Sequence, residues 1–187
     1  YSKGRHLYGL NVAKSSNEKM KRILVVEGYM DVISPHQAGI TNVVASLGTA
    51  LTEGQARLLR KYAEKVIISY DSDGAGQAAT LRGLEILTNV GCDVRILQME
   101  GAKDPDEYIL KNGADAYKES LNHAISLFDF KLSYLKNDKN LNNADELTEY
   151  INNIINELNK SDDDILKNVT INKLSEEYKI DKNILLS

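Results

Sequence analysis

The chain is poor in the residues that stabilise secreted domains, zinc sites and membrane spans. It contains one cysteine, Cys92, and three histidines that stand far apart. It has neither a long apolar run nor a leader-like start. These absences exclude an internal disulfide, give no support to a Cys/His zinc site, and make a soluble cytoplasmic protein with no membrane partner the expectation. Because the chain starts at Tyr1 and not at Met, directly before a dense motif, we expect a piece of a longer protein.

The net charge of −4 is unevenly distributed along the chain. Residues 1–103 carry 13 Lys and Arg against 10 Asp and Glu, a balance of +3, and residues 104–187 carry 10 against 17, a balance of −7. A mildly basic first part is compatible with a polyanion site there. The excess is too small to indicate a dedicated nucleic-acid binder.

The chemical centre that the sequence predicts follows an apolar strand-like run at residues 65–70. That run ends in Asp71 and Asp73, after which two glycines precede a helical pattern that reaches about Val90. Ligands bind at the carboxyl edge of an open α/β sheet, and two hard oxygen donors two residues apart can face one divalent cation there. An Asp-rich turn before a capped helix is the alternative.

This stretch shares its Asp-x-Asp pattern with two known motifs. An EF-hand loop does not fit, because Ala75 and Arg82 stand where oxygen ligands are required. The phosphatase motif of the haloacid dehalogenases fits better, and it would make Asp71 a nucleophile and Asp73 an acid/base. That motif normally closes the first strand of its domain, whereas here an earlier acidic strand end exists at Glu27.

Further carboxylates follow other predicted strands. The run at residues 23–26 ends in Glu27, and Asp31 lies about one helical turn later, near the same edge. Pro35 should kink or shorten the following helix, which we expect to reach about Ala38 with Gly39 as its cap. A run at residues 42–45, a Thr52 capping box and a strand at residues 93–99 continue the alternation, which predicts an α/β fold with a parallel sheet flanked by helices.

A second Asp-x-Asp, Asp104 and Asp106, follows the strand expected at residues 93–99. Asp104 as a helix N-cap before Pro105 explains this segment by itself. The recurrence of carboxylates at three sheet-edge connections instead favours a shared acidic site.

The C-terminal part has helical spacing and carries no predicted chemistry. From residue 114 onward the apolar residues recur at helical intervals, with amphipathic stretches at residues 147–158 and 165–178. We expect three regions: a lead-in segment and linker over residues 1–21, an α/β domain over 22–115, and a small all-α bundle over 116–187. In the lead-in segment Lys3 and Arg5 could contact phosphates, or could simply be solvated.

Five motifs in this order resemble the RNA-polymerase domain of bacterial DNA primases of the DnaG type. They are Lys-Gly-Arg-His-Leu-Tyr-Gly at 3–9, Val-Val-Glu-Gly-Tyr-Met-Asp-Val at 25–32, Ser-Leu-Gly-Thr-Ala-Leu-Thr at 46–52, Tyr-Asp-Ser-Asp-Gly-Ala-Gly at 70–76 and Asp-Pro-Asp-Glu at 104–107. The resemblance covers residues 3–115 and implies a TOPRIM fold, in which acidic residues hold divalent metal. Ser72 replaces the glycine of the family's Asp-Gly-Asp.

The resemblance also implies an activity and a set of site residues. Glu27, Asp71 and Asp73 would be catalytic and bind Mg²⁺ or Mn²⁺, and Glu27 would be either a ligand or a proton acceptor. Further acidic positions of the site match Asp31, Asp104 and Asp106. The implied reaction is the synthesis of short RNA primers on a single-stranded DNA template from ribonucleoside triphosphates.

Other parts of a full primase are expected outside this chain: a zinc-binding domain, the basic half of the polymerase domain, and a domain that binds the replicative helicase. Two alternatives stay open at this stage. One is a TOPRIM nuclease or topoisomerase that cleaves phosphodiesters, and the other is a non-catalytic module that docks a partner.

Overall fold

The computed structural model describes residues 3–15, 20–47, 50–71 and 74–187. The chain divides into two compact units, Tyr1–Phe130 and Lys131–Ser187, which are described separately. No helix among the described residues is both long enough and apolar enough to cross a membrane.

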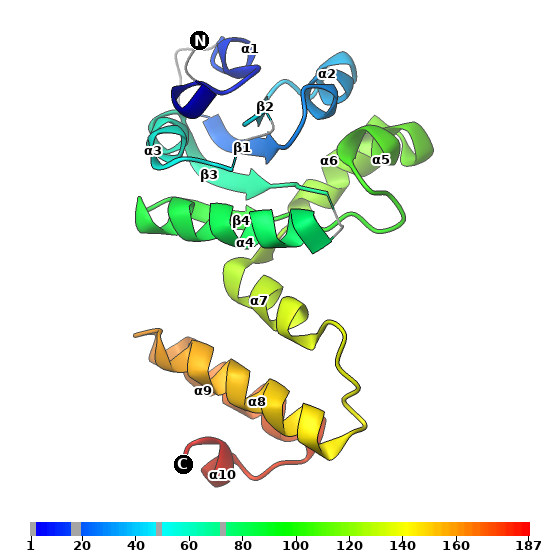
Figure 1. Ribbon diagram of the computed structural model, residues 1–187. Coiled ribbons are helices and arrows are strands. Elements are labelled where there is room, and N and C mark those ends of the chain that lie inside the picture. The colour runs from blue at the N-terminus through cyan, green and yellow to red at the C-terminus, as the bar shows by residue number, and fades with distance from the viewer. Residues whose placement is uncertain (1–2, 16–19, 48–49, 72–73) are drawn as a thin grey trace. The chain divides into compact units, whose positions relative to one another are not determined.

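The first unit is built on a five-stranded sheet in the order β2-β1-β3-β4-β5 (Figure 1). Its strands are β1 (Met20–Val26), β2 (Val43–Ala45), β3 (Ala63–Ile68), β4 (Asp93–Ile96) and β5 (Ile125–Ser126). The first four are parallel, and β5 pairs antiparallel with β4. The predicted α/β fold with a parallel sheet is therefore confirmed, and β5 adds a strand where the sequence indicated only helices.

One face of the sheet packs against α1 (Leu10–Ala13), α3 (Glu53–Tyr62) and α4 (Gly74–Asn89). Alternate residues of the strands, such as Val25 and Ile68, meet Leu59 and Leu84 there, and all four side chains are fully buried. The predicted capping box begins α3, because the Thr52 hydroxyl accepts a hydrogen bond from Gln55 N and the Gln55 side chain accepts one from Thr52 N.

The other face packs against α2 (Met30–Gln37), α5 (Pro105–Asn112), α6 (Ala114–Ser120) and the short helix η2 (Leu121–His123). Pro35 lies inside α2, which continues only to Gln37. The helix ends with Gly39 at φ +83°, and the amide N–H groups of Gly39 and Ile40 donate to the carbonyls of His36 and Pro35. This is a Schellman ending, which favours glycine because of the positive φ. The helix thus ends within one residue of the predicted Ala38, and Gly39 follows it as predicted.

The lead-in segment lies against the edge strand of the sheet. Residues Lys3–Arg5 form a short 3₁₀ helix, η1, and the Thr52 hydroxyl donates to Gly4 O at 2.6 Å. Tyr8 then forms an antiparallel bridge with Ala45, at the end of β2. These bonds fix the segment to β2 and to the start of α3.

The second unit is helical, as predicted. It contains part of α7 (Leu127–Lys136), then α8 (Ala144–Asn159), α9 (Asp164–Tyr178) and α10 (Lys182–Leu185). Asn143, Asp163 and Asp181 accept hydrogen bonds from the first amides of α8, α9 and α10, so each of these helices has a side-chain N-cap. Buried apolar residues, including Ile154 and Leu174, fill the space between the helices.

Candidate functional site

The carboxylates that the sequence singled out follow the carboxyl ends of three adjacent strands. Glu27 comes directly after β1, Asp71 lies three residues beyond β3, and Asp104 begins α5 after β4. The backbone holds these ends in line: Ser69 N donates to Val25 O, and Leu97 N donates to Ile68 O, each at 2.9 Å. The parallel topology therefore brings connections far apart in the sequence to one edge of the sheet.

Asp31 is a buried, hydrogen-bonded carboxylate at this edge. It lies in the first turn of α2, is only 9% exposed, and accepts a hydrogen bond at Oδ2 from Gly28 N at 3.1 Å. A side chain at position 28 would place its Cβ 3.1 Å from the same carboxylate oxygen, so glycine suits this close approach. The sequence placed Asp31 at this edge but gave no sign that it is buried.

Four aspartates, from the three connections that follow β1, β3 and β4, interact electrostatically at this edge. The pKa of Asp31 is raised to about 6, chiefly by burial and also by the negative charges of Asp104, Asp71 and Asp106, while the hydrogen bond from the Gly28 amide opposes the shift. Like charges act in this way only at short range, because water and salt screen distant ones. A cation would relieve this repulsion.

Glu27 lies in a different part of the same edge. Its backbone carbonyl accepts a hydrogen bond from Leu47 N, and its charge acts on Tyr70, the residue before Asp71. Burial raises the pKa of Tyr70 to about 12, and Glu27 adds to the shift. With this raised pKa the buried Tyr70 hydroxyl stays neutral near pH 7. The sequence placed Tyr70 at the end of the apolar run before Asp71 but gave no sign of its interaction with the charge of Glu27.

Asp104 also caps a helix, as the alternative interpretation of this segment predicted. Asp104 Oδ1 accepts a hydrogen bond from Glu107 N at 2.8 Å and caps α5, with Pro105 in the first turn. The same carboxylate acts on Asp31, so capping does not remove it from the acidic group.

Asp71 also borders a cavity of about 260 Å³. Tyr70, Gln77 from α4 and Glu100 from the segment after β4 line it together with Asp71. This space lies beside the acidic edge and offers room for a small group next to the carboxylate.

The remaining predicted residues are only partly described. Asp73 lies outside the described residues, as does Ser72, and nothing is described of the Lys3 side chain. Arg5 is exposed in η1, which is fixed to the N-terminus of α3.

The donor set fits a hard divalent cation. In the described part of the chain, which leaves out Asp73, no three His, Cys, Asp or Glu side chains lie close enough to hold one metal ion. Mg²⁺ commonly binds through one or two carboxylates and keeps several waters, so a complete protein cage is not required. Carboxylates that repel one another at a sheet edge suit such an ion.

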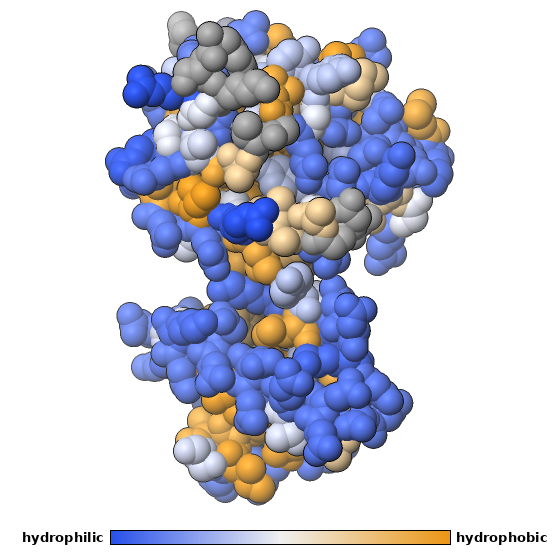
Figure 2. All heavy atoms as spheres, viewed as in Figure 1, coloured by the Kyte–Doolittle hydropathy of each residue, from blue (hydrophilic) through white to orange (hydrophobic). Residues whose placement is uncertain are grey.

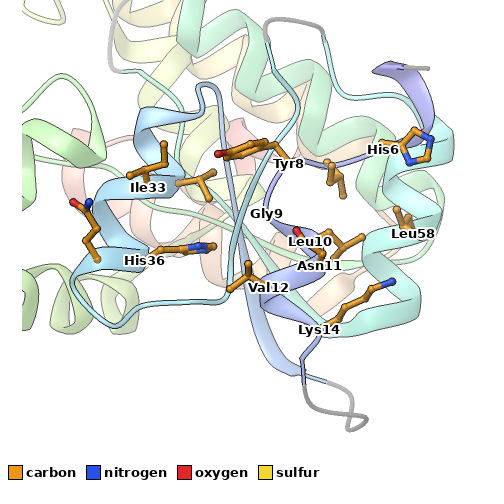
Figure 3. A pocket seen from close by; sticks show the side chains of 13 residues that line it. His6, Tyr8, Gly9, Leu10, Asn11, Val12, Lys14, Ile33, His36 and Leu58 are labelled. Atoms are coloured by element: carbon orange, nitrogen blue, oxygen red, sulfur yellow. The ribbon is translucent and has the colours of Figure 1, made fainter. Parts of the chain in front are cut away.

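A cavity of about 740 Å³ beside the lead-in segment has different chemistry (Figure 3). It lies between α1 and α2, with Tyr8 and His36 on its walls, and no carboxylate is among its described lining residues. The His36 ring is bonded through Nε2 to Val43 O at 3.0 Å, which indicates a structural role.

Comparisons with known proteins agree with this arrangement. The Toprim-like family model matches residues 24–109, and the model for the DnaB-helicase binding domain of primase matches residues 128–183. The second match lies on helices within this chain, whereas the sequence led us to expect helicase binding only in a domain outside it.

Individual relatives give the same result. The chain is 47% identical to the DNA primase of Clostridium acetobutylicum over 176 residues, which is 94% of this chain and 29% of that protein. A structure of the DnaG primase catalytic domain bound to ssDNA matches with a TM-score of 0.74 and 32% identity, over 94% of this chain and 58% of the other. The Aquifex aeolicus primase, solved as its zinc-binding and RNA polymerase domains, matches with a TM-score of 0.70 and 32% identity, over 100% and 44%. The chain thus spans under a third of the length of its first curated relative.

Proposed function

We infer the function of the acidic sheet edge from the premise that this chain belongs to the bacterial DnaG-type DNA primase family. We propose that this edge is the metal-binding part of a centre that synthesises RNA primers on single-stranded DNA from ribonucleoside triphosphates. One observation carries the proposal: Asp71, Asp104 and Asp106, from two other strand connections, lie at the same sheet edge as the buried Asp31 and act on its charge. Their convergence favours a shared acidic centre over a set of independent helix caps.

We assign roles within that centre as follows. Asp71 and Asp73 would hold Mg²⁺ or Mn²⁺, with Asp31, Asp104 and Asp106 adding negative charge around it. When bound, the metal would polarise a phosphoryl oxygen and neutralise charge that develops in nucleotidyl transfer. Glu27, near Tyr70, would complete the ligand set or accept the proton of the attacking hydroxyl.

The lead-in segment would contribute phosphate contacts. Arg5 is exposed in η1, and η1 is hydrogen-bonded to Thr52 at the start of α3. Lys3 belongs to the same short helix. We propose that residues 1–21 guide phosphates, that residues 22–115 carry the chemistry, and that the protein works in the cytoplasm.

The test uses the longer protein to which the chain belongs. Asp71→Asn and Asp73→Asn should each lower primer synthesis by about 100-fold or more, because preorganised charge at a reacting phosphate is worth at least this much. The melting temperature should hold or rise, since each variant relieves like-charge repulsion. Normal primer synthesis by either variant would remove that residue from the mechanism.

A nuclease or topoisomerase remains a distinct outcome of the same assay. Labelled single-stranded and supercoiled DNA would be followed beside primer formation. Metal-dependent cleavage without primer synthesis would replace our proposal with that alternative.

We also propose that residues 128–183 bind the replicative helicase. The family model for DnaB-helicase binding supports this, and so does the apolar surface of the second unit. Ile165 is 78% exposed and Val169 is 45% exposed one turn later on α9. Figure 2 shows further apolar surface near α10, where Ile184 and Leu186, just beyond the matched residues, are also exposed. Exposed apolar groups of this kind often mark protein interfaces.

The helicase proposal has a matched control within the chain. Ile165→Ser should weaken binding to the helicase measured by surface plasmon resonance, whereas Leu110→Ser should not. Leu110 is also 78% exposed, but it lies on α5 in the first unit. Equal binding by wild type and Ile165→Ser would contradict this location of the interface.

A further inference from the structure

The opposite end of the same sheet carries charges of the opposite sign. On the face that packs against α2 and α6, the core contains Leu24, Ile67 and Leu97. Two residues nearer the amino end of each strand, and therefore on the same face, stand Arg22, Lys65 and Arg95. Parallel strands that are covered on both faces carry apolar residues throughout. This half of the face is instead charged and open.

The register brings these positions together. Arg22 pairs with Lys65, Lys65 pairs with Asp93, and Arg95 pairs with Ile67 on the neighbouring strand. Adjacent strands lie about 4.8 Å apart, so the charged groups of three strands can reach one ligand. Residues 22, 65 and 95 are far apart in the sequence, and only the topology makes them neighbours.

A cavity of about 840 Å³ lies over these residues. The strands line it with charged groups, and Leu121, Asn122 and Ala124 line it from the segment around η2. Small-molecule sites in proteins commonly measure about 300 to 1,000 Å³. The cavity therefore has the size of a ligand site.

The charges in the cavity favour an anion. Its lining includes two more cations than anions, in a chain whose net charge is −4: Lys21, Arg22, Lys65 and Arg95 against Glu64 and Asp93. Asp93 lies 3.9 Å from Lys65 Nζ and 3.8 Å from Arg95 Nε. The three side chains are 53%, 41% and 39% exposed, and ion pairs this exposed are weak. A phosphate could replace Asp93 as their partner.

Arg22 is already oriented for such a ligand. Its Nη1 donates to Asn122 Oδ1 at 3.0 Å, which ties the guanidinium to the opposite wall of the cavity. A guanidinium has five N–H donors and binds phosphate in a bidentate manner, so this bond leaves donors for a ligand.

We propose that this cavity binds a small polyphosphate, chemically a nucleoside di- or triphosphate. Arg22, Lys65 and Arg95 would bind the phosphates, and the apolar groups of Leu121 and Ala124 would contact the nucleoside. No aromatic side chain is among the described lining residues, so bases of a single strand could not stack there. Strand β3 has six residues, which separates this site from the acidic edge by roughly 20 Å.

The experiment measures binding of tripolyphosphate and of ATP to the 187-residue chain by isothermal titration calorimetry, in EDTA. EDTA removes divalent metal and so prevents metal-dependent nucleotide binding at the acidic edge. The result is therefore independent of the proposed primase chemistry. We expect Lys65→Gln and Arg95→Gln each to weaken binding about tenfold, as expected for losing a charge-assisted hydrogen bond. Asp93→Asn should tighten binding, because it removes the competing anion.

A matched control keeps the test specific. Arg57→Gln removes an exposed cation of α3 and should not change the affinity. Circular dichroism of each variant verifies the fold. Amide chemical shifts should move at Ile67 and Arg95 when tripolyphosphate is added.

Three results would overturn the proposal. The first is the absence of binding of tripolyphosphate and ATP to the wild type at millimolar concentration. The second is equal affinity in the wild type and in a Lys65→Gln/Arg95→Gln double variant. The third is that the wild type binds a thymidine oligonucleotide more tightly than ATP and that Arg95→Gln abolishes the binding of this oligonucleotide. That result would show that the cations bind a nucleic-acid backbone.

Discussion

The two ends of one parallel sheet differ in charge and in how their charged groups are held. At the carboxyl ends, Asp31 is buried and three other aspartates raise its pKa. At the amino ends, Lys65, Asp93 and Arg95 are half-exposed and form long ion pairs. A cation would relieve the repulsion between the buried Asp31 and its neighbours at the first end. Loosely paired charges make the second end open to exchange with a ligand. The acidic edge and the basic cavity thus lie at opposite ends of the same strands, one strand length apart.

The largest expected difference between the two ends is in metal affinity. In the 187-residue chain, Asp71→Asn should lower Mn²⁺ affinity by about 100-fold, because a carboxylate ligand is lost. Asp93→Asn, the same change at the amino end, should leave that affinity unchanged. Electron paramagnetic resonance of free Mn²⁺ measures both. Equal losses would show that metal binding is not confined to the carboxyl edge.

The second effect concerns stability and its dependence on pH. The pKa of Asp31 in the folded chain, about 6, lies above the value of about 3.9 expected for an unfolded one. The folded state therefore favours the protonated form, and the free energy of unfolding should fall as pH rises from about 4 to 6. Asp31→Asn retains an acceptor for Gly28 N, and it should raise the free energy of unfolding at pH 8 by about 2 to 3 kcal/mol.

Urea unfolding at pH 4 and pH 8 measures this effect. The gain from Asp31→Asn should be small at pH 4, where Asp31 is protonated in the folded state. Asp162→Asn, at an exposed position of the second unit, is the control and should change little at either pH. A loss of stability in Asp31→Asn at pH 8 would contradict the crowding of carboxylates.

A smaller effect should distinguish the roles open to Glu27. Glu27→Gln keeps the shape of the side chain and removes the charge that acts on Tyr70. If Glu27 is a ligand, Mn²⁺ affinity should fall about tenfold or more. If it accepts a proton, affinity should persist and only the chemical step of the longer protein should slow. An unchanged affinity and rate would leave Glu27 as a structural strand-end residue.

The smallest effect tests how the lead-in segment is held near the acidic edge. Thr52 caps α3 and donates to Gly4 O. Thr52→Ala should lower the free energy of unfolding by about 1 to 2 kcal/mol, while Thr52→Ser should retain most of it. Differential scanning calorimetry compares the two variants, and equal melting temperatures for Ala and Ser would exclude the hydroxyl as the anchor.

The sequence predicted the carboxyl edge better than the amino edge for a physical reason. Glu27 and Asp71 each follow an apolar run within a few residues, so local patterns were enough to place them at strand ends. The capping box at Thr52 and the end of α2 near Ala38, with Gly39 after it, were also predicted from short stretches, and the structure confirms both.

Features that depend on tertiary contacts were not predicted. The burial of Asp31 arises because α2 packs beside α5, and no local pattern contains that contact. Strand β5 has two residues and follows a predicted helical pattern, so its pairing with β4 prevails over its local propensity. The grouping of Arg22, Lys65 and Arg95 requires the strand register, which a single sequence does not provide.

The bridge between Tyr8 and Ala45 has a consequence for how the protein behaves in solution. An edge strand with unpaired N–H and C=O groups is a template for pairing with another molecule, and β2 lies at one edge of this sheet. Tyr8 N and Ala45 O, and Ala45 N and Tyr8 O, bond across that edge at 2.9 and 3.0 Å. The lead-in segment therefore protects the sheet from aggregation, and a shorter chain that began after Gly9 would expose a strand edge at which copies could join.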